Sequence, residues 1–226
     1  MYKIETHMHT KYSSGCGQLN EKELVEGYLA AGYAAVTVTD HYNRYNILDK
    51  GACKDYVKRF LDGYYRVKEE GERHGLRVYK GAEIRFDGSD NDYLLLNYHD
   101  ELLKDPESFF TMGLEKFAPI YRADGALLIQ AHPNRAGCSE ADHRFLDGVE
   151  VLNMHPGHLH HNNNRKTLEY AQCWPELIRV SGSDCHQTHH MAQGGIIASW
   201  LPENEAELVK LLRSKNYELI GSFDRK

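Results

Sequence analysis

The chain has 226 residues, of which 41% are hydrophobic and 27% are charged, as in an ordinary globular protein. Its formal net charge of −6 gives no basic footprint for duplex DNA or an anionic membrane, although short nucleic acids gripped through metal ions stay compatible with it. The sequence has no signal-peptide pattern and no apolar run near ~20 residues, so we expect a cytoplasmic protein with no membrane attachment.

The five cysteines are odd in number and scattered, and no Cys-x-x-Cys pair is present. We therefore expect reduced thiols and no structural zinc ribbon. The unusual feature of the composition is its 14 histidines. They form no long run, so each must be judged by its place in the predicted elements.

Strand-like and helix-like segments alternate along the chain. Strands are predicted at residues 2–6, 34–40, 77–86, 92–98, 126–131, 148–153, 177–183, 194–200 and 216–221. Helices are predicted at residues 20–33, 54–74, 107–121, 165–173 and 203–213. Asn20 and Glu23 have the spacing of a helix capping box, and Gly32 and Gly75 are candidate helix ends. This alternation predicts an α/β fold with a largely parallel sheet, and the length fits one barrel-type domain of about 200–250 residues.

Potential metal ligands stand at the ends of the predicted strands. His7 and His9 end the first strand, where alternate side chains point the same way and can meet one point. The later strands end near Asp40, His41, Glu83, His132, His155, Asp184 and His186. Because the carboxyl ends of parallel barrel strands gather on one face, we expect these side chains to share one basin.

Imidazoles combined with carboxylates suit Zn²⁺, Mn²⁺ or Fe. Carboxylates such as Glu83 and Asp184 can bridge two ions, and an ion pair can hold a hydroxide and clamp the oxygens of a phosphoester. Any one of these residues alone would more often be a solvated or hydrogen-bonded side chain. Their joint occurrence at successive strand ends predicts a metal site.

Five motifs occur in a recognisable order: HMHTKYS, TVTDH, GAEI, AHPNR and SGSDCH. Together they resemble the successive motifs of the PHP (polymerase and histidinol phosphatase) superfamily, from residue 4 to about residue 200. The resemblance implies a distorted (β/α)7 TIM-like barrel, here a single domain over residues 1–226. It also implies a cluster of two to three divalent ions at the carboxyl ends of the strands.

The resemblance also implies which residues bind the ions. It assigns His7, His9, Glu83 and Asp184 to the first ion, Glu83 and His132 to the second, and His41 and His186 to the third. Asp40 precedes His41 and would orient it from behind.

The sequence departs from the family pattern at two places. The loop after His9 reads KYSSGCG, where many members carry a His or Asp, so Cys16 or water would complete the third site, and a free loop cysteine is the alternative. The second departure lies between Glu83 and His132, where family members often supply another histidine to the second ion and this chain offers His99 and Tyr93. His155 is favoured for that place, and His99 is the other candidate.

Substrate contacts are less marked in the sequence. Arg135 is the best candidate to bind a phosphoryl group, because its planar fork suits two phosphate oxygens. Lys11 and Arg165 are weaker candidates, as are Arg44 and Arg85, and for each a solvated surface position is the alternative. Several loop histidines could act as rim donors or general acids, or could simply be solvated: His158, His160, His161, His189 and His190.

We therefore expect a metal-dependent phosphoesterase. A hydroxide bridging the ions would attack a small phosphomonoester, histidinol-phosphate-like or nucleotide-like, or a short nucleic acid. Asp184, Asp40 and Arg135 are the predicted catalytic residues, with Arg135 steadying the phosphoryl group and Asp184 a possible proton donor to the leaving oxygen. A non-catalytic metal-binding or regulatory module, and a hydrolase of a C–N or C–O bond, are the alternatives.

Overall fold

The computed structural model describes residues 1–49 and 55–223. Its strands are β1 (Tyr2–Met8), β2 (Tyr33–Val38), β3 (His41–Tyr42), β4 (Arg77–Arg85), β5 (Asp92–Leu96), β6 (Leu127–Gln130), β7 (Gly148–Asn153), β8 (Ile178–Gly182), β9 (Gly195–Ala198) and β10 (Tyr217–Ile220). Its helices are α1 (Glu21–Ala30), α2 (Tyr56–His74), α3 (Pro106–Met112), α4 (Leu114–Asp124), α5 (Asn164–Cys173) and α6 (Glu205–Ser214). The predicted start of the second helix at Lys54, and Cys53 beside it, lie outside the described residues.

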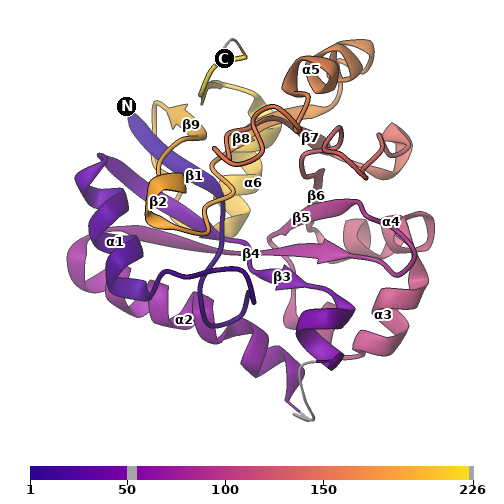
Figure 1. The fold of residues 1–226 in the computed structure, drawn as a ribbon, viewed down its shortest axis with the longest axis horizontal. Coiled ribbons are helices and arrows are strands. Elements are labelled where there is room, and N and C mark those ends of the chain that lie inside the picture. Colours follow the sequence, from indigo (N-terminus) through magenta and orange to yellow (C-terminus); the bar gives the residue numbers. More distant parts are fainter. Residues whose placement is uncertain (50–54, 224–226) are drawn as a thin grey trace.

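The strands form one sheet in the order β10-β9-β1-β2-β4-β5-β6-β7-β8, with β3 beside β4. The sheet curls into a nearly closed barrel with helices around it, as Figure 1 shows. Parallel pairing links β1 to β2, β2 to β4, β3 to β4, β6 to β7 and β7 to β8. The predicted α/β barrel is therefore confirmed.

Two strands, β5 and β9, run against the others and depart from the expected parallel arrangement. β5 runs antiparallel to β4 and to β6, and β9 runs antiparallel to β1 and to β10. The reason at β5 is visible in the sequence: only residues 86–91 separate it from β4. A parallel crossover needs about a dozen residues or more. A connection as short as this one can therefore only make an antiparallel hairpin.

The barrel closes weakly where β1 meets β8. Met8 forms an isolated parallel bridge with Cys185, and the backbone N–H of His9 donates to the carbonyl oxygen of Cys185 at 2.9 Å. The Thr6 hydroxyl donates to the carbonyl oxygen of Ser181 at 2.6 Å. This seam places the end of the first strand beside the segment that follows the eighth.

The core follows the alternation of side chains along the strands. In β2, Ala35 packs in a cluster that draws residues from strands all around the barrel and from α6, including Leu211. Val36 and Val38 pack instead with residues of α1 and α2, such as Val67. The barrel is thus filled with apolar side chains below the strand ends, and α6 adds to that filling.

Helix boundaries match the local signals in most places. Asn20 caps α1 in a capping box with Glu23, and Gly75 ends α2 in the left-handed conformation. The predicted helix over residues 107–121 is instead two helices, because Gly113 between them has φ 78° and ψ 162°. Only glycine adopts such a backbone conformation readily. Over residues 1–49 and 55–223, the helices are all too short or too polar to cross a bilayer.

We expect Gly113→Ala to lower the free energy of unfolding by about 1–3 kcal/mol, because a Cβ strains this backbone conformation. Chemical denaturation measures the change. Lys116→Ala on the exposed side of α4 is the matched control and should change stability by less than about 0.5 kcal/mol. Equal effects of the two substitutions would contradict the assignment of strain to Gly113.

Candidate metal centre

Four buried side chains converge where β1, β4 and β8 end. The Nε2 atoms of His7 and His9 lie 3.2 Å apart. Asp184 Oδ1 lies 3.5 Å from His7 Nε2 and 3.2 Å from His9 Nε2. The two oxygens of Glu83 lie 3.4 Å from His7 Nε2 and 3.3 Å from His9 Nε2. These nitrogen and oxygen atoms point at a common centre, as the ligands of one ion would.

Hydrogen bonds on the far side of each ring fix which nitrogen faces this centre. His7 Nδ1 donates to Glu150 Oε1 at 2.9 Å, and His186 Nδ1 donates to the backbone carbonyl of Asp184 at 2.8 Å. Nε2 of each ring therefore carries the lone pair in its neutral form. Carboxylate and carbonyl partners of this kind orient histidines that bind metals.

His9 is oriented through a relay. The Ser14 hydroxyl gives its proton to Asp40 Oδ1 at 2.7 Å, so it accepts from His9 Nδ1 at 3.0 Å. Ser14 Oγ also accepts a hydrogen bond from the backbone N–H of His41 at 2.9 Å. Asp40 is held by the backbone N–H and hydroxyl of Thr10, both at 2.7 Å. Asp40 thus lies behind the centre, and it orients the His9 ring and the His41 backbone through Ser14.

Glu83 joins the first group to two further histidines. His132 Nε2 lies 3.0 Å from Glu83 Oε1, and His41 Nδ1 lies 2.8 Å from Glu83 Oε2. Despite this distance, His41 Nδ1 and Glu83 Oε2 are buried and make no well-formed hydrogen bond within the described part of the chain. A buried carboxylate oxygen without a donor is costly, and a cation between these atoms would satisfy it. The donor set therefore fits a metal ion.

Charge in the centre also fits a cation. Burial alone would raise the pKa of Glu83 and of Asp184. The neighbouring His41 and His7 instead hold the pKa of Glu83 well below its usual range. His7 and Arg135 do the same for the pKa of Asp184. Burial would lower the pKa of His7, yet the surrounding carboxylates raise it well above its usual value. The carboxylates are therefore ionised and attract positive charge, whether a proton on His7 or a metal ion.

Two of the converging residues have unusual backbone conformations. His132 has φ 30° and Asp184 has φ 51°, in the left-handed region that side chains other than glycine rarely adopt. Strain of this kind is concentrated at functional sites, where surrounding contacts hold it. Here the His132 N–H donates to Glu150 Oε2 at 3.1 Å, so the same carboxylate that orients His7 also fixes the His132 backbone.

Asp92 is a candidate ligand that the sequence reasoning missed. One of its oxygens lies within 4.8 Å of ligand atoms of Glu83 and His41, and Asp92 Oδ2 lies 3.9 Å from His132 Nε2. Asp92 begins β5, whereas the ligands predicted from the sequence lie at or near the ends of strands. Because β5 runs antiparallel, its first residue and not its last lies at the site. Arg85 holds Asp92 through two hydrogen bonds, the one to Oδ1 being 2.7 Å long.

Glu150 was also missed, although the sequence carries a signal for it. It is the one charged residue in the buried segment GVEVLN, between two valines, and its side chain is fully buried. Gly182 allows its approach to His7, because a Cβ at that position would lie 2.5 Å from Glu150 Oε1. A charged residue inside a buried strand is rare without a partner, so it could have been predicted as a support of the site.

Neither histidine considered for the second ion lies beside Glu83 and His132. His99 is exposed and pairs with Asp124 at 2.9 Å. His155 lies on another wall, with its ring centroid 4.0 Å from that of His190 and 5.6 Å from that of His186. The structure thus groups His155 with the residues around His186.

Cys16 lies beside the third group, formed by His9, His41 and His186, whose ligand atoms are within 4.8 Å of one another. Burial would raise the pKa of its thiol, but hydrogen bonding to His186 and His41 lowers it to about 6. A thiol with this pKa is mostly thiolate at neutral pH, the form that binds metals. Cys185, by contrast, is buried in the core beside Met8.

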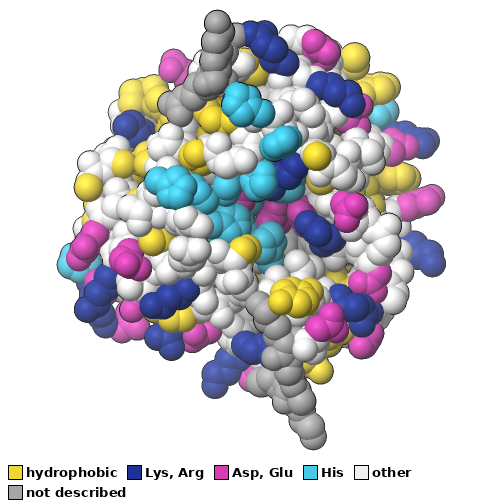
Figure 2. Space-filling model, viewed as in Figure 1, with side chains coloured by type: hydrophobic (Ala, Val, Ile, Leu, Met, Phe, Trp, Pro, Cys, Tyr) yellow, Lys and Arg dark blue, Asp and Glu magenta, His cyan; other side chains and the backbone are white. Residues whose placement is uncertain are grey.

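A cavity of about 450 Å³ opens onto this centre. Figure 2 shows histidine side chains gathered around acidic ones in the middle of this face, with Lys and Arg side chains beside them. The lining residues are Cys16, His41, Glu83, Arg85, Asp92, Arg135, His155, His158, Asp184, His186, Gln187, His189 and His190. Within residues 1–49 and 55–223, neither Lys11 nor Arg165 belongs to this lining.

Arg135 is fixed by one asparagine at the end of β7, one asparagine in the loop before α5, and Asp184. Its Nε donates to Asn162 at 2.7 Å, and its Nη2 donates to Asn153 at 3.0 Å and to Asp184 Oδ2 at 2.7 Å. The contact with Asp184 leaves the other oxygen of that carboxylate toward His7 and His9. Arg135 therefore positions a candidate metal ligand and also faces the cavity.

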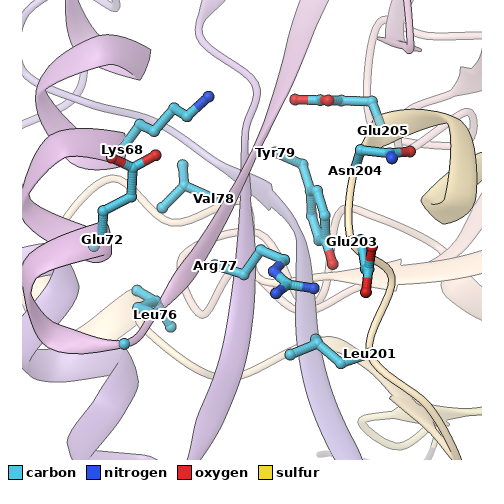
Figure 3. A pocket seen from close by; sticks show the side chains of 12 residues that line it. Lys68, Glu72, Leu76, Arg77, Val78, Tyr79, Leu201, Glu203, Asn204 and Glu205 are labelled. Atoms are coloured by element: carbon cyan, nitrogen blue, oxygen red, sulfur yellow. The ribbon is translucent and has the colours of Figure 1, made fainter.

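A different cavity lies at the other end of β4, between α2 and the segment before α6. Figure 3 shows charged side chains of both signs around it, including Lys68, Glu72 and Arg77. Arg77 Nη1 and the Tyr79 hydroxyl both donate to the carbonyl of Pro202 at 2.6 Å, which joins β4 to that segment. Histidine and cysteine are absent from its described lining, so this cavity lacks the donors of the metal centre.

We expect Glu150→Gln to weaken metal binding by about 10–100-fold, the usual effect of losing a carboxylate behind a metal-binding histidine. Whichever way the new amide turns, its NH₂ faces a donor: His7 Nδ1 on one side, or the His132 N–H and Asn153 on the other. Competition with a chelator measures affinity. Glu169→Gln on the exposed face of α5 is the control, and equal affinities in the two variants would contradict this role.

Comparisons with known proteins agree with this picture. Residues 5–225 match the family model described as PHP domain. No curated protein matches the chain. PsfC from Pseudomonas syringae PB-5123 superimposes with a TM-score of 0.71 at 16% identity, over 98% of this chain and 91% of that one.

Two further solved structures are similar in fold. A two-domain protein from Bacteroides vulgatus ATCC 8482, containing a predicted PHP-like metal-dependent phosphoesterase, gives a TM-score of 0.68 at 16% identity, over 97% of this chain and 64% of that one. An amidohydrolase from Chromobacterium violaceum gives 0.54 at 15% identity, over 81% and 87%. The family match extends over nearly the whole sequence, and the chain therefore belongs to the PHP domain family.

Proposed function

We propose that residues 1–226 act as a single PHP domain that hydrolyses a small phosphomonoester with the help of two or three divalent metal ions. The observation that carries this proposal is the convergence of His7, His9, Glu83 and Asp184 at the floor of a cavity that Arg85 and Arg135 also line. Ligands for cations and donors for an anion stand together there, as hydrolysis of a phosphoester requires.

The residues divide among three ion positions. His7, His9, Glu83 and Asp184 would hold the first ion; Glu83, His132 and Asp92 the second; and His41, His186 and Cys16 the third. This donor set suits Zn²⁺, Mn²⁺ or Fe. When bound, the ions would supply the charge that turns water into a nucleophile near neutral pH and neutralises the phosphoryl oxygens.

The remaining residues would position the substrate and the ligands. Arg135 keeps Asp184 in place through one carboxylate oxygen, and its own position is fixed by Asn153 and Asn162. Its guanidinium is only partly exposed, so little water would have to leave it when a phosphoryl group binds. Asp40 acts as a positioning residue through Ser14, rather than as a group that touches the substrate.

The size of the cavity supports a small substrate. A volume of about 450 Å³ falls in the range of sites for small molecules, and the net charge of −6 does not favour binding of a long nucleic acid. A nucleotide-like or histidinol-phosphate-like ester fits this description. Hydrolysis of a C–N bond is the second candidate, because one similar structure is an amidohydrolase.

We expect phosphate release from p-nitrophenyl phosphate and from small phosphomonoesters after loading with Mn²⁺ or Zn²⁺, and a loss of about 100-fold or more in kcat in Asp184→Asn. Glu203→Gln, beside the cavity of Figure 3, is the control and should keep the wild-type rate. Amide substrates are assayed in parallel. If the protein hydrolyses amides but not phosphoesters, the second candidate, hydrolysis of a C–N bond, replaces the proposal. If the metal-loaded protein hydrolyses neither, both candidates are wrong.

The role of Cys16 has a spectroscopic test that needs no substrate. The protein loaded with Co²⁺ should show a near-ultraviolet thiolate-to-cobalt charge-transfer band, because the thiolate lies beside His41 and His186. Cys16→Ser should lose the band. Cys173→Ser, which changes an exposed thiol on α5, should keep it. Absence of the band from the wild type would leave the third position to nitrogen ligands and water.

A further inference from the structure

A second group of histidines lines the cavity beside the proposed metal centre. The ring centroid of His155 lies 4.0 Å from that of His190 and 4.6 Å from that of His158. His155 and His190 are both largely buried. The acidic residues that line the cavity are Glu83, Asp92 and Asp184. The side of the cavity beside them carries no acidic residue and is formed by His155, His158, Gln187, His189 and His190.

The backbone fixes the tautomers of the two buried rings. The N–H of Gly157 donates to His155 Nδ1 at 3.1 Å, and the N–H of His186 donates to His190 Nδ1 at 3.4 Å. An Nδ1 atom that accepts a hydrogen bond carries a lone pair, so the proton of each neutral ring is on Nε2. His155 and His190 therefore present N–H donors, in contrast to the neutral rings of His7, His9 and His186, whose Nε2 atoms carry lone pairs.

This difference separates the two histidine groups by chemistry. His155, His186 and His190 each offer a ligand atom within 4.8 Å of the others, so a cation site would also be conceivable from distance alone. However, two of its rings use their lone pairs to accept backbone N–H groups, and they cannot coordinate an ion without giving these up. Two rings whose centroids lie 4.0 Å apart and that each keep an N–H donor suit anionic oxygens instead, and the carboxylate that acts on both rings, Asp184, is itself paired with Arg135.

We propose that His155 and His190 form a second anion subsite, which binds a carboxylate or phosphate of the substrate other than the phosphoryl group that is hydrolysed. The inference rests on the proposed function and deepens it: the substrate is a phosphomonoester with a second anionic group. Arg135 and the ions would hold the first group, and the two histidines would hold the second across the cavity.

Binding of non-hydrolysable probes tests the subsite without any turnover. Methylphosphonate carries one anionic group, and phosphonoacetate, 3-phosphonopropionate and 1,3-propylenediphosphonate carry two. Calorimetry on the Mn²⁺-loaded protein should find at least one two-group probe bound about tenfold more tightly than methylphosphonate, the gain expected from hydrogen bonds to a charged group. The carboxylate and diphosphonate arms distinguish the two kinds of second group. Equal affinities for all probes would overturn the proposal.

Paired variants assign the gain to the donors. His155→Asn and His190→Asn keep an acceptor near the place of Nδ1 but remove the distal N–H, whereas His155→Gln and His190→Gln keep a distal N–H. We expect the Asn variants to lose the preference for the two-group probe about tenfold and the Gln variants to keep most of it. His99→Asn, at an exposed histidine paired with Asp124, is the matched control.

Elemental analysis of each variant separates the subsite from a metal site. The proposal requires unchanged metal content in the Asn variants; a loss of one ion per chain would make His155 and His190 ligands and overturn it. An equal loss of affinity for one-group and two-group probes would also overturn it. If the wild type binds two-group probes preferentially but hydrolyses no phosphoester, the proposed function fails and the subsite stands.

Discussion

Three buried carboxylates surround the imidazole ring of His7: those of Glu83, Glu150 and Asp184. Carboxylates so close together repel one another unless positive charge lies among them. Arg135 supplies part of that charge to Asp184. The rest must come from protonated histidines or from metal ions, and this demand accounts for the density of imidazole at the strand ends. The centre is therefore a site whose occupancy should stabilise the fold as well as serve chemistry.

The rigidity of the centre comes from groups that do not touch it. Ser14 forms hydrogen bonds with Asp40, the His9 ring and the His41 backbone, while Glu150 connects the His7 ring, the His132 backbone and Asn153. Each of these two side chains fixes more than one candidate ligand, so the two networks act as shared supports. Removing one support should disturb several ligands together, whereas removing one ligand leaves the others in place.

Periodicity was enough to predict the α/β alternation, the family resemblance of the motifs implied the barrel, and strand-end position predicted that His7, Glu83 and Asp184 share one face. They failed where a strand changed direction, since Asp92 reaches the site from the start of β5. Spacing also could not decide between His99 and His155, because their environments depend on loops that connect distant strands. The break at Gly113 was missed because apolar periodicity continues across it, and only the backbone conformation of the glycine shows the turn.

The weak pairing between β1 and β8 means that an ion at the first position would also connect two distant parts of the chain. His7 and His9 belong to the beginning of the chain and Asp184 to its last third, and the backbone joins these regions by few hydrogen bonds. An ion held between them would work as a clasp across a very long loop, comparable to a cross-link that restricts the unfolded chain. Loss of the ion would then loosen the barrel first along this line, while the β4–β5 hairpin, closed by a short turn, would keep Glu83 and Asp92 together.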